Sequence, residues 1–172
     1  MKIIIQISSN IFDDLRKHLL APKRVVEEAA FVFARVKRSG EHVMFDYLEH
    51  IKANQDDFKI QTGYHIELTD EFQGRVIKHA HDLKASLIEF HSHLGQEKAR
   101  FSGSDWSGFS QFVPHVFWRL AKRPYAAVVV ANSSTDALAW IDDPTKPCKV
   151  DSLEVGTKKM KPTSLSFQKY VE

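Results

Sequence analysis

Residues 85–105 have the sequence ASLIEFHSHLGQEKARFSGSD. The first six residues, ASLIEF, form a short apolar run that is typical of a buried strand. Residues 94–101 show no apolar pattern and predict a loop. A helix is expected from Ser102, because apolar residues recur behind it at steps of three and four. This order of strand, loop and helix predicts a domain in which helices pack on a sheet.

The flanking sequence predicts further strands and helices. Helices are expected behind Ser9 or Asn10 and behind Thr69, and Pro114 is expected to kink or interrupt the helix that starts at Ser102. Residues 54–63 are polar and predict a loop. The expected fold class is α/β (α+β), with a mixed, mostly antiparallel β-sheet flanked by helices. The expected strands are 2–8, 29–34, 42–51, 64–68, 85–90, 125–131, 137–141 and 150–155.

Length and composition predict a single cytoplasmic domain over residues 1–172, with residues 157–172 as a partly mobile tail. The chain has 24 Lys+Arg and 22 Asp+Glu, a net charge of +2, which does not indicate nucleic-acid binding. No apolar run is long enough for a membrane span or a signal peptide. The single cysteine, Cys148, excludes an internal disulfide and favours a reducing compartment.

The strongest chemical pattern is His91-Ser92-His93 followed by Asp105. Side chains two residues apart on a strand project from the same face, so the two imidazoles are expected to converge. Asp105 lies in the first turn of the next predicted helix, within reach of the strand end. Two imidazoles and one carboxylate are a common ligand set for zinc, and three protein ligands leave a position for water. Glu27 and Glu28 are the candidate general bases for that water.

Other interpretations of these residues exist. Ser102-x-x-Asp105 is also a helix-capping pattern, and a His-x-His pair on a strand often binds no metal. His79 and His81 have the same spacing, but a step of two in a helix turns the side chain by about 200°, so they are expected on the surface. The remaining histidines have no companion spacing and are expected to have no metal role: His18, His42, His50, His65 and His115.

An upstream glutamate, His-Ser-His at a strand end, a short loop and Ser-x-x-Asp opening a helix resemble the JAMM signature of JAB/MPN metalloproteases. The resemblance covers roughly residues 20–141. It implies a cytidine-deaminase-like JAB/MPN domain and one Zn²⁺ ion per chain. It further implies the role of each matching residue: His91, His93 and Asp105 as metal ligands, Glu27 as the proton acceptor, and Ser102 as the donor to the oxyanion.

The chain departs from the family pattern at three points. Leu94 replaces the proline that usually follows the second histidine, the loop before Ser102 is one residue longer than usual, and Ala30 stands where glycine is common. Glu27 is favoured over Glu28 because the family places a small residue three positions after its glutamate. That position is Ala30 when counted from Glu27, but Phe31 when counted from Glu28.

The resemblance implies zinc-dependent hydrolysis of peptide or isopeptide bonds at the C-terminus of a ubiquitin-like protein, in deconjugation or precursor maturation. Prokaryotic members of similar size are often associated with activating and conjugating enzymes, so we expect a compact, deubiquitinase-like isopeptidase. The alternative is a noncatalytic module that docks a ubiquitin-like or sulfur-carrier protein. A zinc deaminase is excluded, because its Pro-Cys-x-x-Cys signature needs two cysteines.

Overall fold

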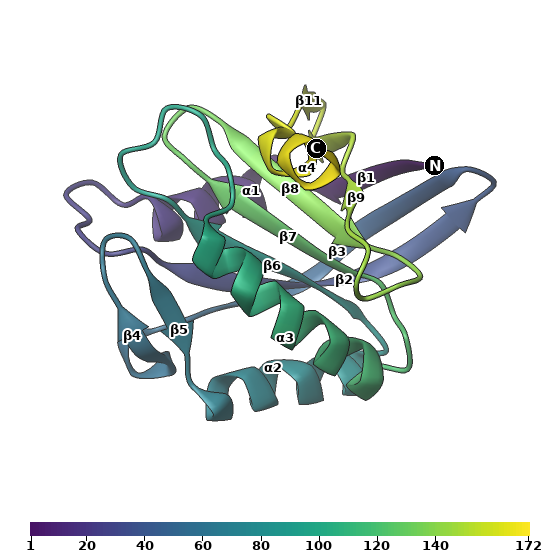
Figure 1. The fold of residues 1–172 in the computed structure, drawn as a ribbon, viewed down its shortest axis with the longest axis horizontal. Coiled ribbons are helices and arrows are strands. Elements are labelled where there is room, and N and C mark those ends of the chain that lie inside the picture. The colour runs from purple at the N-terminus through teal and green to yellow at the C-terminus, as the bar shows by residue number, and fades with distance from the viewer.

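Nine strands form one twisted sheet in the computed structural model, which describes residues 1–172 (Figure 1). The strand order is β11-β10-β1-β3-β2-β6-β7-β8-β9, and β4 pairs with β5 in a separate two-stranded sheet. The pairs β1–β10, β1–β3 and β6–β7 are parallel, and all other neighbours are antiparallel. The predicted class, a mixed and mostly antiparallel sheet with flanking helices, is confirmed.

The elements follow one another along the chain in short connections. The first half contains β1 (Lys2–Ile7), α1 (Ser9–Leu19), β2 (Ala29–Ser39), β3 (His42–Lys52), the 3-10 turn η1 (Gln55–Asp57), β4 (Phe58–Gln61), β5 (Ile66–Leu68) and α2 (Asp70–Leu83). The second half contains β6 (Ser86–Ser92), α3 (Gly103–Arg119), β7 (Tyr125–Val130), β8 (Thr135–Trp140), β9 (Cys148–Lys149), β10 (Ser152–Val155), β11 (Lys158–Met160) and α4 (Leu165–Val171).

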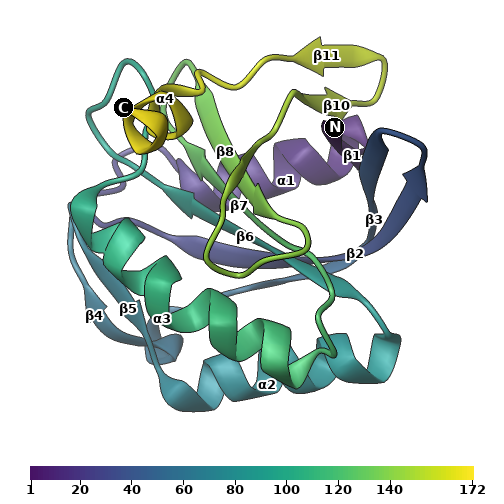
Figure 2. The same ribbon diagram turned by 45° about the vertical axis from the view of Figure 1, so that its right-hand side comes forward.

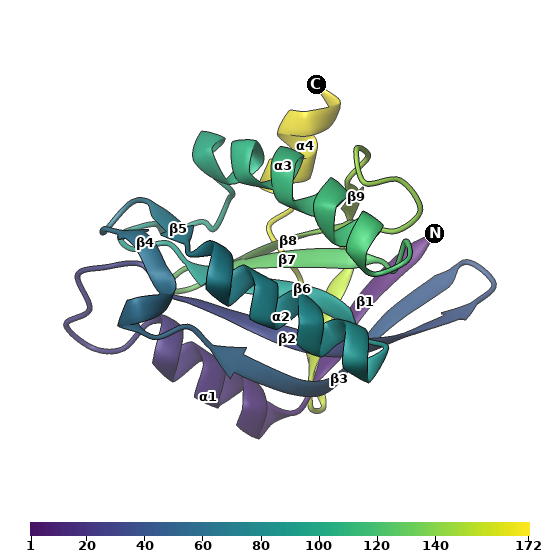
Figure 3. The same cartoon turned by 90° about the horizontal axis from the view of Figure 1, so that it is seen from below.

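Helices cover both faces of the sheet, as Figure 3 shows for α3 and α1. Phe31 and Phe33 of β2 pack in one core with side chains of α2 and α3, whereas Val32 belongs to a second core together with α1. A strand that is buried on both faces has no polar alternation, which explains the apolar run over residues 29–34, the first half of β2. The central strands β2, β6 and β7 therefore lie between the two apolar cores.

Three details of the local structure differ from those expected. Helix α3 continues through Pro114 without the interruption that was one of the two expected effects, and Val113 and Phe117 on either side of the proline are buried in the apolar core. The cap of α1 is Ser8, whose side chain accepts a hydrogen bond from the Ile11 amide, and not Ser9 or Asn10. The expected loop 54–63 contains η1 and β4. None of the four helices is long and apolar enough to cross a membrane.

The C-terminal segment 157–172, expected as a partly mobile tail, contains β11 and α4. Helix α4 lies against β8 (Figure 2), and the fully buried carboxylate of Asp136 accepts hydrogen bonds from the amides of Ser164 and Ser166, both at 2.9 Å. The Ser166 hydroxyl in turn accepts from the Phe101 amide at 2.8 Å. The end of the chain thus anchors the residue that precedes Ser102.

Replacing Asp136 with alanine is expected to destabilise the protein by about 3 kcal/mol or more, because the amides of Ser164 and Ser166 then lose their buried acceptor. For a chain of this size that corresponds to a fall in Tm of roughly 6–12 °C, measurable by thermal denaturation. Asp142→Ala, which removes an exposed carboxylate paired with Arg38, serves as control and should leave Tm nearly unchanged. Equal Tm values for the two variants would contradict the anchoring role.

Candidate metal centre

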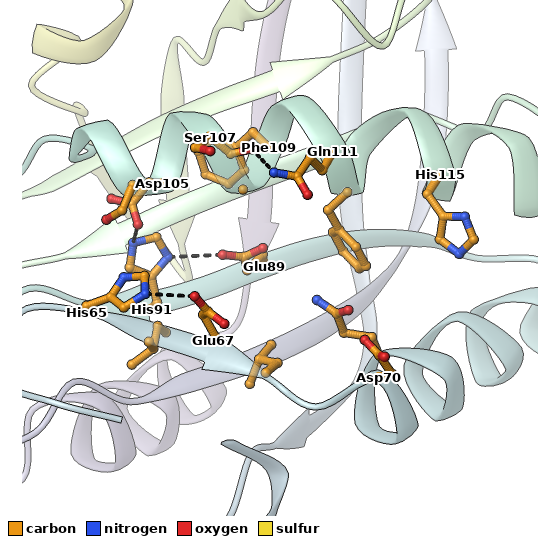
Figure 4. Close-up of a pocket in the computed structure, with 16 residues that line it drawn as sticks. His65, Glu67, Asp70, Glu89, His91, Asp105, Ser107, Phe109, Gln111 and His115 are labelled. Carbon is orange, nitrogen blue, oxygen red and sulfur yellow. Dashed lines mark hydrogen bonds and ion pairs between the residues drawn. The ribbon is translucent and has the colours of Figure 1, made fainter. Parts of the chain in front are cut away.

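His91, His93 and Asp105 converge at one end of the sheet. His91 lies in β6, His93 follows the end of that strand, and Asp105 lies in the first turn of α3. The Asp105 carboxylate is 3.4 Å from His91 Nε2 (Figure 4) and 3.1 Å from His93 Nε2. The three ligand atoms all lie within 4.8 Å of one another. The structure therefore contains the His-His-Asp group that the sequence predicted.

The unpaired nitrogen of His91 fits a cation. His91 Nδ1 donates to the Glu89 carboxylate at 3.1 Å, and His93 Nδ1 donates to the Gln96 side-chain oxygen at 3.3 Å. The two Nε2 atoms are left to face Asp105, and His91 Nε2 is buried without a hydrogen-bond partner. A buried polar atom without a partner is costly, and a metal ion would relieve that cost. These donors match the set that zinc prefers.

The electrostatics of the centre also favour a positive charge. Burial opposes a charge on His91, but the carboxylates of Asp105 and Glu89 outweigh burial and raise the pKa of His91 to about 10. Burial likewise raises the pKa of Asp105, but His91, His93 and the Ser102 amide hold it well below its usual range. The same carboxylates would attract a metal cation bound between the histidines.

The start of α3 fixes the position of Asp105. Ser102 caps the helix, because its hydroxyl oxygen accepts from the Asp105 amide at 3.2 Å. In return, Asp105 Oδ2 accepts from the Ser102 amide at 2.6 Å and from its hydroxyl at 2.8 Å. The capping interpretation and the ligand interpretation of this motif are thus both compatible with the structure, since one carboxylate serves the helix end and faces the histidines.

Glu27 lies beside the triad, immediately before β2. Its carboxylate is 4.0 Å from His93 Nε2, and its side chain is almost fully buried. Two hydrogen bonds hold its backbone to the neighbouring hairpin, one from its amide to the Thr62 carbonyl at 2.8 Å and one from the Gln61 side chain to its carbonyl at 2.9 Å. Burial raises the pKa of Glu27, although the charges of His93 and His91 oppose the rise.

Glu28 is placed differently. Its carboxylate pairs with Arg24 at 2.7 Å and lies 3.8 Å from His18 Nε2. Its amide donates to the Ser92 hydroxyl at 2.9 Å, and its carbonyl accepts from the Ser92 amide at 3.0 Å. The adjacent glutamates therefore have separate surroundings, and Glu27 is the one that lies near the triad.

A cleft of about 660 Å³ opens beside His91 and Asp105, between β5, the start of α2 and α3. Figure 4 shows Glu67, Asp70 and Gln111 along its walls, with Phe109 among the apolar residues that line it. No lysine or arginine lines this cleft. The cleft thus leads to His91 and Asp105 along walls that are rich in carboxylates and amides.

Several contributors to the site were missed at the sequence level. Glu89 and Gln96 hold the two histidines, and Ser104 lines the cleft with its hydroxyl 2.9 Å from that of Ser102. One signal for Glu89 was present, since it is the only charged residue within ASLIEF and lies two positions before His91. The predicted surface positions of His79 and His81 are confirmed.

The fold and the triad together define a mixed α/β protein with a candidate His-His-Asp metal centre. No family of known proteins matches the chain, and no curated protein matches it either.

Proposed function

We propose that this protein is a zinc metallopeptidase of the JAB/MPN type with a cytidine-deaminase-like fold. Its proposed activity is hydrolysis of peptide or isopeptide bonds at the C-terminus of a ubiquitin-like protein. The observation that carries the proposal is the placement of Glu27, whose carboxylate lies 4.0 Å from His93 although 66 positions separate the two residues along the chain. A buried carboxylate beside a potential metal ligand set is a requirement of hydrolysis and not of docking.

The protein's own residues supply the ligands and the general base. His91, His93 and Asp105 would hold the ion, and zinc bound there would polarise the scissile carbonyl and lower the pKa of a water molecule toward ~7. Glu27 accepts a proton from the attacking water at its carboxylate and passes it to the leaving amine. Its carboxylate lies close enough to the candidate ligands to take the proton from a water bound there and return it to the leaving group.

Ser102 is the proposed donor to the oxyanion. Its hydroxyl contacts Asp105 Oδ2 at 2.8 Å and Ser104 Oγ at 2.9 Å, and a hydroxyl hydrogen can rotate toward a new acceptor. The backbone amide of Ser102 keeps its own bond to Asp105 Oδ2 at 2.6 Å during that rotation. Asp105 therefore stays in place while the Ser102 hydroxyl donates to the oxyanion of the substrate.

The substrate is proposed to bind as an added strand, since main-chain pairing can present one peptide bond without deep pockets. A seat on a sheet edge beside residues 94–101 is unsuitable, because β6, which precedes this loop, is paired with β2 and β7. Strand β5 pairs only with β4 and lines the cleft, so its free edge is the better seat. The extended C-terminal tail of a ubiquitin-like protein matches such a path in shape.

The proposal predicts that the purified, zinc-loaded protein removes a C-terminal extension from a folded ubiquitin-like protein, and that a chelator stops the reaction. Mass spectrometry of the products locates the cleaved bond. Cleavage of unfolded polypeptides alone would overturn the proposed specificity. Tight binding of the ubiquitin-like protein without any cleavage would favour the alternative, a noncatalytic docking module. We further propose that the protein acts in a prokaryotic cytoplasm, together with enzymes that activate and conjugate the ubiquitin-like protein.

A further inference from the structure

Glu89 is a charged residue on an apolar face of the sheet. It is paired across the sheet with Phe31 on β2 and with Ala127 on β7, and Leu87 lies two positions before it on the same face. Its side chain is only 17% exposed. A carboxylate in such surroundings is costly unless its oxygens are hydrogen-bonded, so its partners indicate why it is there.

Both oxygens of Glu89 have partners. Oε1 accepts from His91 Nδ1 at 3.1 Å, and Oε2 accepts from the Tyr125 hydroxyl at 2.6 Å (Figure 4 shows the first of these bonds). The ring of Tyr125 is fully buried between Phe112 and Trp140, with centroid distances of 5.9 and 5.8 Å. The packed ring fixes the hydroxyl, and the hydroxyl fixes the carboxylate.

The hydrogen bond from His91 Nδ1 to Glu89 determines the state of the other ring nitrogen, Nε2. A carboxylate can only accept, so Nδ1 must carry the hydrogen, and in the neutral ring Nε2 then presents its lone pair. That nitrogen is buried, has no hydrogen-bond partner and lies 3.4 Å from Asp105 Oδ1. Only one of the two neutral ring forms can therefore bind a metal ion here, and Glu89 selects it.

We propose that Glu89 and Tyr125 are positioning residues of the metal centre, which orient His91 and hold its ring in the form that binds the ion through Nε2. The inference rests on the proposed metal-dependent function but concerns neither the base nor the substrate. Carboxylates behind metal-binding histidines raise metal affinity in this way, and their loss commonly costs about 10–100-fold in affinity.

The test is zinc affinity, measured by competition with a chromophoric chelator. Glu89→Gln is expected to weaken binding by about 10–100-fold, and Tyr125→Phe by roughly 10-fold. The double variant Glu89→Met/Tyr125→Phe removes the carboxylate together with the hydroxyl that donates to it, so no buried tyrosine hydroxyl is left without an acceptor. It frees the ring of His91 from its partner at Nδ1, and circular dichroism checks that the variant is folded. Glu67→Gln is the matched control, because Glu67 lines the same cleft and contacts a histidine, His65, outside the triad. Its zinc affinity should equal that of the wild type.

A second readout needs no metal. A crystal structure of each metal-free protein should show the His91 ring held with Nδ1 toward residue 89 in the wild type and a turned or disordered ring in the double variant. Wild-type zinc affinity and an unchanged ring orientation in the double variant would overturn the inference, as would equal losses in Glu67→Gln and Glu89→Gln. A wild-type protein that binds no zinc would overturn the proposed function instead, and the ring orientation would still decide the role of Glu89.

Discussion

Replacing Glu27 with glutamine is expected to lower turnover by about 10²–10⁴-fold while zinc content and Tm are retained. Glutamine keeps the size and hydrogen-bonding reach of the side chain but cannot accept the proton from water. The backbone bonds that place residue 27, to Thr62 and from Gln61, do not involve its carboxylate. Turnover of a tail-extended ubiquitin-like protein, elemental analysis and thermal denaturation measure the three quantities.

Glu28→Gln is the control for this variant, and it is expected to change stability and not turnover. Its buried carboxylate pairs with Arg24, so the substitution should lower Tm. Turnover per folded molecule should remain close to that of the wild type. The reverse outcome for the two variants would make Glu28 the base without changing the metal ligands, and normal turnover in the double variant would remove both glutamates from the mechanism.

The double substitution His91→Ala/His93→Ala is expected to abolish zinc binding and with it all hydrolysis. Wild-type protein should contain about one zinc ion per chain, because the triad forms one site. The fold should survive, since the two apolar cores extend over the whole sheet and do not depend on the site. Elemental analysis and circular dichroism separate loss of metal from loss of fold.

His79→Ala/His81→Ala supplies a control with the same spacing. These histidines lie on the exposed side of α2, where His79 pairs with Glu49, so this variant should bind as much zinc as the wild type. Equal zinc content in all three proteins would refute the assignment of His91 and His93 as ligands.

The sequence predicts those elements whose burial is visible in their own apolar pattern, without knowledge of a distant partner. The first half of strand β2, residues 29–34, was recognisable because both of its faces are covered, which requires an unbroken apolar run; its exposed second half, to Ser39, was not. Strand β4, with the sequence FKIQ, was not, because a half-exposed strand with one partner has little apolar signal. The end of the chain was not predictable for a related reason. Its order depends on Asp136, a single buried carboxylate on a distant strand.

The residues of the candidate site likewise fall into those that local sequence patterns predict and those that depend on distant contacts. His91, His93 and Asp105 could be predicted because a strand period and a helix start place them from local rules. The contact between Glu89 and Tyr125 could not, because it depends on the parallel pairing of β6 with β7, and the two residues are 36 positions apart. Sequence patterns thus identify the candidate ligands, and the tertiary structure identifies the residues that contact their far sides.

Asp105 has two partners of different kinds, since one carboxylate closes the first turn of α3 and faces the two histidines. For an ion held as proposed, unwinding of that turn would withdraw one of its three protein ligands. The opening of a single helical turn would then influence how fast the centre exchanges its metal. Residues that fray or strengthen the start of α3 would act on metal retention, even though they would donate no electron pair to the ion.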